Sequence, residues 1–359
     1  MSRKRLRRFG GFLALVLLAA ALAGGWLWQR YARFADGPLH GVRAGQTLAV
    51  ERGDSLPAVV RRLRAAGVET GEMLEWRALA RQLKVDGRLQ VGEYALAPGI
   101  SPRELLLAMR DGKVIRHRFT IVEGWNIREL RAALARATPL RQETAGLDDA
   151  ALMKALGRPG THPEGRFLPE TYLYTRGDSD LDLLRRAQAA MDRALDAAWR
   201  GRAPDAPLKS PEELLILASI VEKETGIAEE RPRIAGVFAR RLRLGMRLQT
   251  DPTVIYGLGS AYDGNIRKRD LLADTPYNTY VRAGLPPTPI AMPGADALRA
   301  AARPAPGEEL YFVAVGDGSG RHLFAETLAE HQANVRAYLQ RYRLGRAGQG
   351  AAPAAQEAR

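Results

Sequence analysis

Two glutamates at the end of an apolar run are the residues of this sequence best placed to do chemistry. The segment from Leu214 to Gly226 reads LLILASIVEKETG, so Glu222 and Glu224 follow a stretch that is almost wholly apolar. Acidic residues are disfavoured near the negative end of a helix dipole, and partial burial raises a carboxyl pKa by destabilising the charged form. A carboxyl group of that kind can act as a general acid near neutral pH. The alternative is a set of ordinary solvated charges at a helix end.

The helix that carries these glutamates has clear boundary signals. Ser210 suits the N-cap, Pro211 suits the first helical position, and Glu213 suits the third position of a capping box. Gly226 is expected to end the helix as the residue after its C-cap. Because the residues between are nearly all apolar, we expect this helix to lie at the centre of its domain.

The spacing of the two glutamates separates them around the helix. At about 100° per residue, Glu222 projects near Leu215 and Ala218, whereas Glu224 projects about 200° away from Glu222. Residues two apart do not face each other on a helix, so the two carboxyl groups cannot act as an adjacent pair.

Two later segments collect polar and aromatic side chains in what the pattern predicts to be loops. Gln249, Thr250 and Asp251 form a polar turn, and Asn278 and Tyr280 lie in a proline-rich stretch. Amides and hydroxyls hydrogen-bond sugar hydroxyls, and aromatic rings stack on sugar faces, so these residues are candidates for substrate binding. The alternative is that Asp251 and Asn278 only cap turns.

The composition narrows the function further. The chain has 359 residues, 46% of them hydrophobic, with no cysteine and five histidines. Thiolate sites are excluded, the histidines lack metal-ligand spacing, and we expect neither a metal nor a cofactor. The formal net charge of +14 suits nucleic acid, an anionic membrane surface or an acidic polymer.

The N-terminal sequence predicts a membrane anchor, and the location that the anchor implies decides between nucleic acid and an acidic polymer outside the cytoplasm as partner. A basic end, residues 1–8, precedes an apolar stretch from Phe9 to Trp28 of about 20 residues, enough to span a bilayer. A cleaved signal peptide is the alternative, but the stretch is long and ends in Trp26, Trp28 and Tyr31. A transmembrane helix over 9–30 would place the rest of the chain outside the cytoplasm. Nucleic acid is then not expected as a partner.

The remaining chain is expected to have an α+β fold in two parts. Residues 46–115 alternate short strands and helices in a compact unit, joined to the anchor by a short glycine-rich linker over 35–45. Residues 116–340 are expected to form a larger, mixed α+β domain. Residues 341–359 have low complexity and are expected to be a disordered tail.

Several long strings of this sequence resemble the MltG-type (YceG-like) endolytic murein transglycosylase family. They are LASIVEKETG, RLRLGMRLQTDPTVIYGLG, YNTYVRAGLPPTPIAMPGADALRAAARP and LYFVAVGDGSGRHLFAETLAEH, with EGRFLPETYLY upstream. The resemblance covers about residues 40 to 340, a length that fits two domains of ordinary size. It implies a single-pass inner-membrane protein that cleaves nascent peptidoglycan strands outside the cytoplasm. It also implies a LysM-like glycan-binding subdomain at 46–115 and a catalytic domain at 116–340, with peptidoglycan synthases as candidate partners.

The resemblance carries the catalytic role to Glu222, the first glutamate of the VEKET string. A single carboxyl group would protonate the glycosidic oxygen and then deprotonate the C6 hydroxyl of N-acetylmuramic acid, which leaves a 1,6-anhydro end without using water. Gln249, Asp251, Asn278 and Tyr280 would then bind the sugar.

Two other functions remain open from the sequence. One is a hydrolytic muramidase with Glu222 as acid and Asp251 as base or nucleophile. The other is a peptidoglycan-binding scaffold without catalysis, which would use residues 46–115 to hold glycan.

Overall fold

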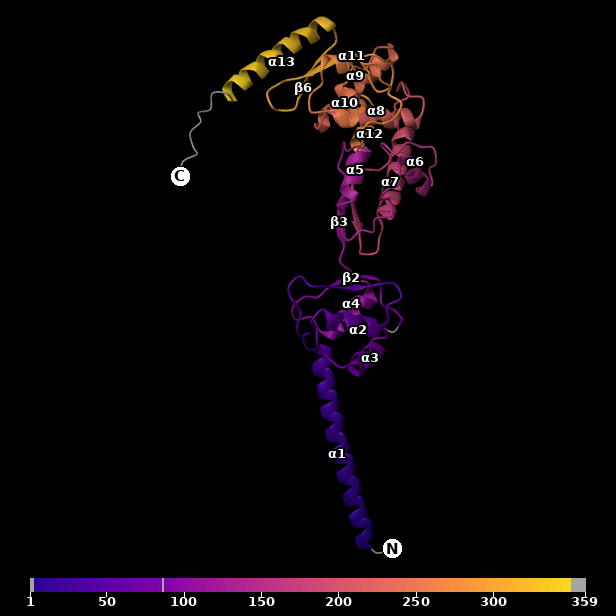
Figure 1. The fold of residues 1–359 in the computed structure, drawn as a ribbon, viewed down its shortest axis with the longest axis vertical. Helices are drawn as coiled ribbons and strands as arrows, with labels where there is room; N and C mark the ends of the chain where they lie inside the picture. The colour runs from indigo at the N-terminus through magenta and orange to yellow at the C-terminus, as the bar shows by residue number, and fades with distance from the viewer. Residues whose placement is uncertain (1–2, 86, 350–359) are drawn as a thin grey trace. The chain divides into compact units, whose positions relative to one another are not determined.

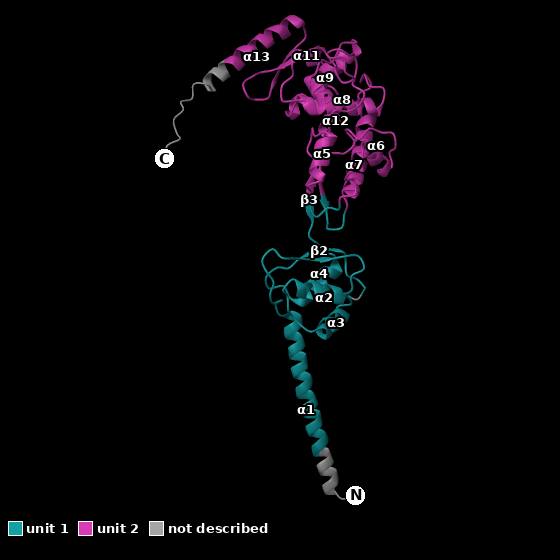
Figure 2. Cartoon of the chain, viewed as in Figure 1, with its two compact units in different colours: residues 1–117, 138–141, 173–178 teal, residues 118–137, 142–172, 179–359 magenta. Residues whose placement is uncertain are grey.

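The computed structural model describes residues 3–85 and 87–349, and the chain divides into two compact units (Figure 2). Unit 1 comprises residues 1–117, 138–141 and 173–178, and unit 2 comprises residues 118–137, 142–172 and 179–359. The expected boundary near 115 thus lies close to the first division, although two short later segments also belong to unit 1.

Unit 1 contains one long helix and a small α+β body (Figure 1). Its elements are α1 (Arg3–Asp36), β1 (Thr47–Val50), α2 (Leu56–Ala65), α3 (Met73–Gln82), β2 (Gly92–Ala95) and α4 (Pro102–Asp111). Strands β1 and β2 pair antiparallel, with Thr47 opposite Ala95 and Val50 opposite Gly92. Trp76 and Tyr94 are both 1% exposed and fill the core between this sheet and the helices. Short strands and helices, as expected over 46–115, therefore make up this body.

The end of α1 is part of the unit 1 core. Phe34 and Ala35 are buried there, and the Phe34 ring meets the Trp76 ring edge to face, with centroids 5.4 Å apart. Leu39, just beyond the helix, is 4% exposed. The glycine-rich linker expected over 35–45 therefore begins later than predicted, because α1 continues to Asp36 and the side chains at 34, 35 and 39 pack in the unit 1 core.

From His117 onward, the described chain contains far more helix than strand. Its elements are β3 (His117–Thr120), α5 (Ile127–Leu134), α6 (Asp149–Ala155), β4 (Thr171–Tyr174), α7 (Asp180–Arg200), α8 (Pro211–Glu224), the short 3₁₀ turns η1 (Ala228–Glu230) and η2 (Gly259–Ala261), α9 (Arg231–Arg243), α10 (Asp251–Leu258), α11 (Lys268–Leu272), α12 (Ala295–Ala302), β5 (Tyr311–Ala314), β6 (His322–Ala325) and α13 (Leu328–Gln349). The sheets are small and two-stranded: β1 with β2, β3 with β4, and β5 with β6. The expected α+β class is confirmed.

Helix α8 is the central element of unit 2, as its apolar sequence predicts. Every residue from Leu214 to Val221 is buried, and the helix packs against α7, α9, α10 and α12. Ser210 caps it, since its side chain accepts the Glu213 N–H. The helix ends where the sequence predicts, since the C-cap is Thr225 and Gly226 follows it, although Thr225 is extended and Gly226 does not adopt a positive φ.

The C-terminal part of the described chain contains a hairpin and a long helix. Strands β5 and β6 pair antiparallel, and residues 315–321 connect them. Helix α13 continues to Gln349, so residues 341–349 of the expected disordered tail are helical. Residues 350–359 lie outside the described residues.

Candidate active site

Glu222 lies in an ion cluster on one side of α8, here called the Arg231 cluster. Its side chain is 4% exposed, and Oε1 lies 3.4 Å from a guanidinium nitrogen of Arg231. Its Oε2 accepts the Gly294 N–H at 2.8 Å. The same guanidinium lies 3.4 Å from Glu123 and 3.7 Å from Asp296. Burial raises the pKa of Glu222, and Arg231 and the Gly294 N–H oppose this.

Glu224, the last residue of α8, lies in a second cluster, here called the Glu224 cluster. The hydroxyl of Thr250 donates a hydrogen bond to Oε1 of Glu224. Burial raises the pKa of Glu224 to about 7, and the nearby charge of Asp251 adds to this, while the Thr250 hydroxyl and Arg241 oppose it. The residue as a whole stays partly exposed. This carboxyl group can therefore give or take a proton near neutral pH.

Three of the sequence-predicted site residues surround the Glu224 cluster. The Tyr280 hydroxyl donates to Oδ1 of Asp251 at 2.6 Å. The N–H groups of Gln249 and Thr250 donate to the carbonyl and the side-chain oxygen of Thr279, each at 3.1 Å. Gln249 is exposed, and its φ of 51° is uncommon for a residue other than glycine. Asp251 is also exposed, and it begins helix α10 where the sequence predicted only a turn.

Asn278 has a different place from the one expected. It is 1% exposed, and its amide donates to the carbonyls of Asp270, Leu271 and Ala273 at 3.1, 3.1 and 2.7 Å. Its side-chain oxygen accepts the Tyr280 N–H at 2.9 Å. The side chain is occupied by contacts to the end of α11 and to its own loop, so the geometry favours a structural role that holds Tyr280 in place. A direct sugar contact by Asn278 stays a prediction.

The structure therefore divides the expected site. Gln249, Asp251 and Tyr280 gather with Glu224, whereas Glu222 joins the Arg231 cluster. The helical spacing correctly placed the two glutamates on different sides of α8. It gave no means of knowing which side faces the polar segment at 249–251, because that depends on how α10 packs against α8.

Glu164 is a buried acid that the sequence reasoning did not single out. It is 0% exposed, and both its carboxyl oxygens lie 3.1 Å from the Ile127 N–H at the start of α5. Burial raises its pKa to about 7, opposed by hydrogen bonds from the Ile127 N–H and the Tyr256 hydroxyl. Tyr256 belongs to α10, the helix that begins at Asp251. Glu164 thus links α5 to the helix that carries part of the Glu224 cluster.

The described residues contain no group of three or more His, Asp or Glu side chains that could hold a metal ion. Near the N-terminus, one helix contains a segment, Gly11–Asp36, that is long and apolar enough to cross a membrane.

Comparison with known proteins places these clusters in a family. A model of the YceG-like family matches residues 48–337. Over 267 residues, the chain is 32% identical to an endolytic murein transglycosylase of Bacillus subtilis, a match that covers 70% of this chain and 73% of that protein. A protein of the same name from Streptococcus pneumoniae is 26% identical over 359 residues, which covers 89% of this chain and 63% of the streptococcal protein.

The fold agrees with these matches. The crystal structure of a yceG-like protein from Listeria monocytogenes matches with a TM-score of 0.51 and 28% sequence identity, covering 80% of this chain and 98% of the Listeria chain. The family match includes all of α8 and both carboxyl clusters. The chain therefore belongs to the YceG-like family, and the Bacillus and Streptococcus proteins to which it is similar bear the name endolytic murein transglycosylase.

Proposed function

We propose that this protein is an endolytic murein transglycosylase, a lyase that cuts peptidoglycan glycan strands internally and leaves 1,6-anhydro ends. The observation that carries the proposal is the Glu224 cluster, a desolvated carboxyl group with a pKa of about 7 beside exposed polar residues. Two findings support peptidoglycan as the substrate: the cluster lies within the region matched by the family model, and the similar proteins are named endolytic murein transglycosylases.

The proposed reaction needs only one carboxyl group. Protonated Glu224 gives its proton to the glycosidic oxygen as the bond from that oxygen to C1 of N-acetylmuramic acid breaks, with the electron pair going to the oxygen. The carboxylate then takes the proton of the C6 hydroxyl on the same sugar, and O6 forms a bond to C1. Glu224 ends protonated and no water is consumed. Proton transfer of this kind contributes about 10²–10⁴ in rate.

Glu224 fits this role better than Glu222, the residue that the family resemblance implied. The Glu222 carboxylate contacts the Arg231 guanidinium and accepts the Gly294 N–H, and both contacts favour the charged form of Glu222. They also connect α8 to α9 and to the N-cap of α12. Glu224 accepts one hydroxyl hydrogen bond and lies beside another carboxylate, Asp251. We therefore assign proton transfer to Glu224 and a structural role to Glu222.

A matched pair of variants tests this assignment. Glu224→Gln keeps the shape of the side chain but has no transferable proton, so turnover on isolated glycan strands should fall by at least about 10² while the fold is retained. Glu222→Gln should lower activity less, and it should lower the melting temperature because it weakens the Arg231 cluster. Mass analysis should find wild-type products that are one water lighter than hydrolysis products. Reducing ends would favour a muramidase, and the reverse order of the two variants would return the acid role to Glu222.

We propose that α1 anchors the protein in the cell inner membrane, with the α+β body of unit 1 and all of unit 2 outside the cytoplasm. The apolar side chains of this helix support the proposal, since Phe12, Leu15 and Leu22 are each 67–68% exposed and find no protein partner to cover them. The basic residues before Phe9 favour a cytoplasmic N-terminus. Peptidoglycan synthases remain candidate partners from the resemblance alone.

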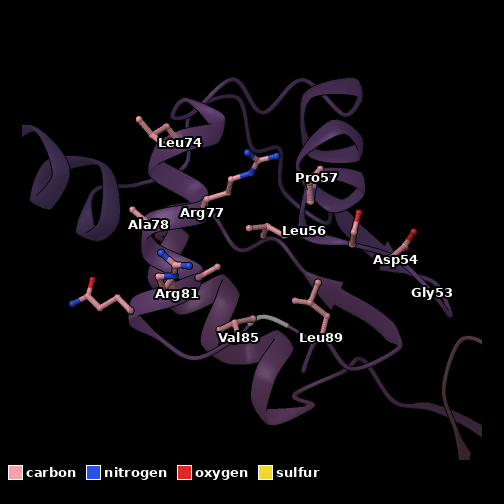
Figure 3. A pocket seen from close by; sticks show the side chains of 14 residues that line it. Gly53, Asp54, Leu56, Pro57, Leu74, Arg77, Ala78, Arg81, Val85 and Leu89 are labelled. Carbon is pink, nitrogen blue, oxygen red and sulfur yellow. The ribbon is translucent and has the colours of Figure 1, made fainter.

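We further propose that unit 1 binds glycan in a cavity of about 1120 Å³ (Figure 3). The cavity lies between the loop that precedes α2 and the residues of α3 and its following loop. Leu56 and Val85 give it an apolar floor, and Arg77 and Arg81, one turn apart on α3, line its side. An apolar floor suits sugar ring faces, and the guanidinium groups suit the carboxylates of an acidic wall polymer. This is the role expected for a LysM-like subdomain.

A further inference from the structure

A second cavity of unit 1, of about 650 Å³, opens where α1 meets the small α+β body. Its lining carries charged side chains of both signs, from the end of α1, from α2, and from the α2–α3 connection and α3. They are Arg30, Arg33, Arg64, Glu69, Glu72 and Glu75. The proposed reaction uses none of them.

The charges in this cavity are only partly paired with each other. Arg30 lies 3.0 Å from Glu75, and Arg64 lies 3.9 Å from Glu72. Within residues 3–85 and 87–349, no ion pair involves Arg33 or Glu69, and both residues are exposed. The cavity therefore offers one cation and one anion to a ligand that carries both signs of charge.

The cavity also has a definite depth if α1 spans a bilayer. The apolar stretch ends at Trp28, and a helix rises about 1.5 Å per residue, so Arg30 and Arg33 lie about 3 and 7.5 Å beyond it. The headgroup layer on each side of a bilayer is about 5–7 Å thick. Trp26 and Trp28 are 59% and 67% exposed, as side chains at a membrane interface are. The cavity thus falls at the level of the lipid headgroups.

The wall of the cavity is fixed by packing. Phe34 lines it, and its ring is held against Trp76 in the core of unit 1. Gly71, also in the lining, has a φ of +76°, and a Cβ there would lie 2.1 Å from the Phe34 ring. Only glycine allows this close approach, so α1 and the α2–α3 connection meet in one preformed arrangement.

We propose that this cavity binds the headgroup of a phospholipid that carries a phosphate and a primary ammonium group, with the phosphate at Arg33 and the ammonium at Glu69. A guanidinium pairs well with phosphate, and a primary ammonium has three N–H donors for a carboxylate. A quaternary ammonium has no N–H donor, and an anionic headgroup without an amine leaves Glu69 unpaired. The inference rests on the proposed membrane anchor and goes beyond the proposed reaction.

The experiment uses the full chain in nanodiscs of equal parts phosphatidylethanolamine, phosphatidylcholine and phosphatidylglycerol. After gentle release from the discs, native mass spectrometry identifies the lipid that stays bound. We expect phosphatidylethanolamine to be retained about tenfold over each of the others. Arg33→Gln and Glu69→Gln should each bring this ratio close to one. Arg61→Gln, an exposed residue of α2 outside the cavity, is the matched control and should leave the ratio unchanged.

The other outcomes each overturn the inference in a recognisable way. Equal retention of the three lipids by the wild type, or an equal loss in Arg61→Gln, rules out a headgroup site here. Competition by soluble phosphoethanolamine at submillimolar concentration, without lipid preference, would assign the cavity to a free phosphate compound. A full chain that stays out of the nanodiscs would remove the anchor and this site together. Loss of lipid preference with normal insertion and normal glycan cleavage would remove this site alone.

Discussion

At the scale of single residues, the proposed proton transfer belongs to Glu224, and the neighbouring carboxylate of Asp251 affects the pKa of Glu224. Because the charge of Asp251 helps to hold the pKa of Glu224 near 7, a general acid at Glu224 should lose activity as the pH rises through about 7. Asp251→Asn removes that charge and keeps an oxygen for the Tyr280 hydroxyl. The pKa of Glu224 should then fall, and the alkaline limb of the kcat profile should move to lower pH.

The products of Asp251→Asn give the control for this prediction. They should still carry 1,6-anhydro ends, since Asp251 takes no proton in the proposed reaction. Complete loss of activity in this variant would instead support a hydrolase with two carboxyl groups. An alkaline limb that does not move would mean that Glu224 is not the titrating acid.

At the scale of secondary-structure elements, Glu164 connects α5 with α10 and should make the stability of unit 2 depend on pH. Its pKa is about 7 in the folded protein and near 4.5 when unfolded, so the folded state binds more protons between these values. The free energy of unfolding should therefore fall as the pH rises from about 4.5 to 7, by at most about 3 kcal/mol from this group. Glu164→Gln, which mimics the protonated acid, should remove that part of the slope.

Denaturant unfolding of the wild type and Glu164→Gln at pH 5 and pH 8 measures this difference directly. Glu222 and Glu224 also have raised pKa values and add slopes of the same sign, so only the difference between the two proteins isolates Glu164. A free-energy difference between the proteins that is the same at both pH values would show that Glu164 does not titrate with folding.

Helix α3 provides the second prediction at this scale, because it carries the guanidinium groups of the proposed glycan cavity. Arg77→Gln with Arg81→Gln should raise the KM for glycan strands several-fold and leave kcat nearly unchanged, since these residues belong to unit 1 and the Glu224 cluster belongs to unit 2. Steady-state kinetics on strands of defined length checks this. The matched control is Arg61→Gln on α2, outside the cavity. A fall in kcat at constant KM would contradict a purely binding role.

At the scale of the whole molecule, the orientation of the chain across the membrane decides whether it can meet peptidoglycan at all. The basic residues before Phe9 should keep the N-terminus in the cytoplasm, so a reporter fused after Arg359 should work only outside it. Paired fusions to alkaline phosphatase and to a cytoplasmic fluorescent protein test this. Cytoplasmic fluorescence at the C-terminus would contradict both the anchor orientation and the proposed substrate.

The sequence alone determined the features that depend on local patterns. Apolar runs and cap residues located α8, the sequence pattern indicated an α+β body over 46–115, and long shared strings identified the family. The helical period also showed that Glu222 and Glu224 face different ways, because side-chain direction along a helix follows from spacing.

Only the tertiary structure decided which glutamate meets which partners. The contact between Glu224 and Thr250 joins residues from α8 and from the segment before α10, and Glu222 meets Arg231 through the packing of α9. Burial, which raises the pKa of Glu224 and Glu164, is likewise a product of several elements packed together. Sequence spacing determines neither the contacts of the two glutamates nor the burial of Glu224 and Glu164, because the packing of the helices sets the distance between residues far apart in the chain.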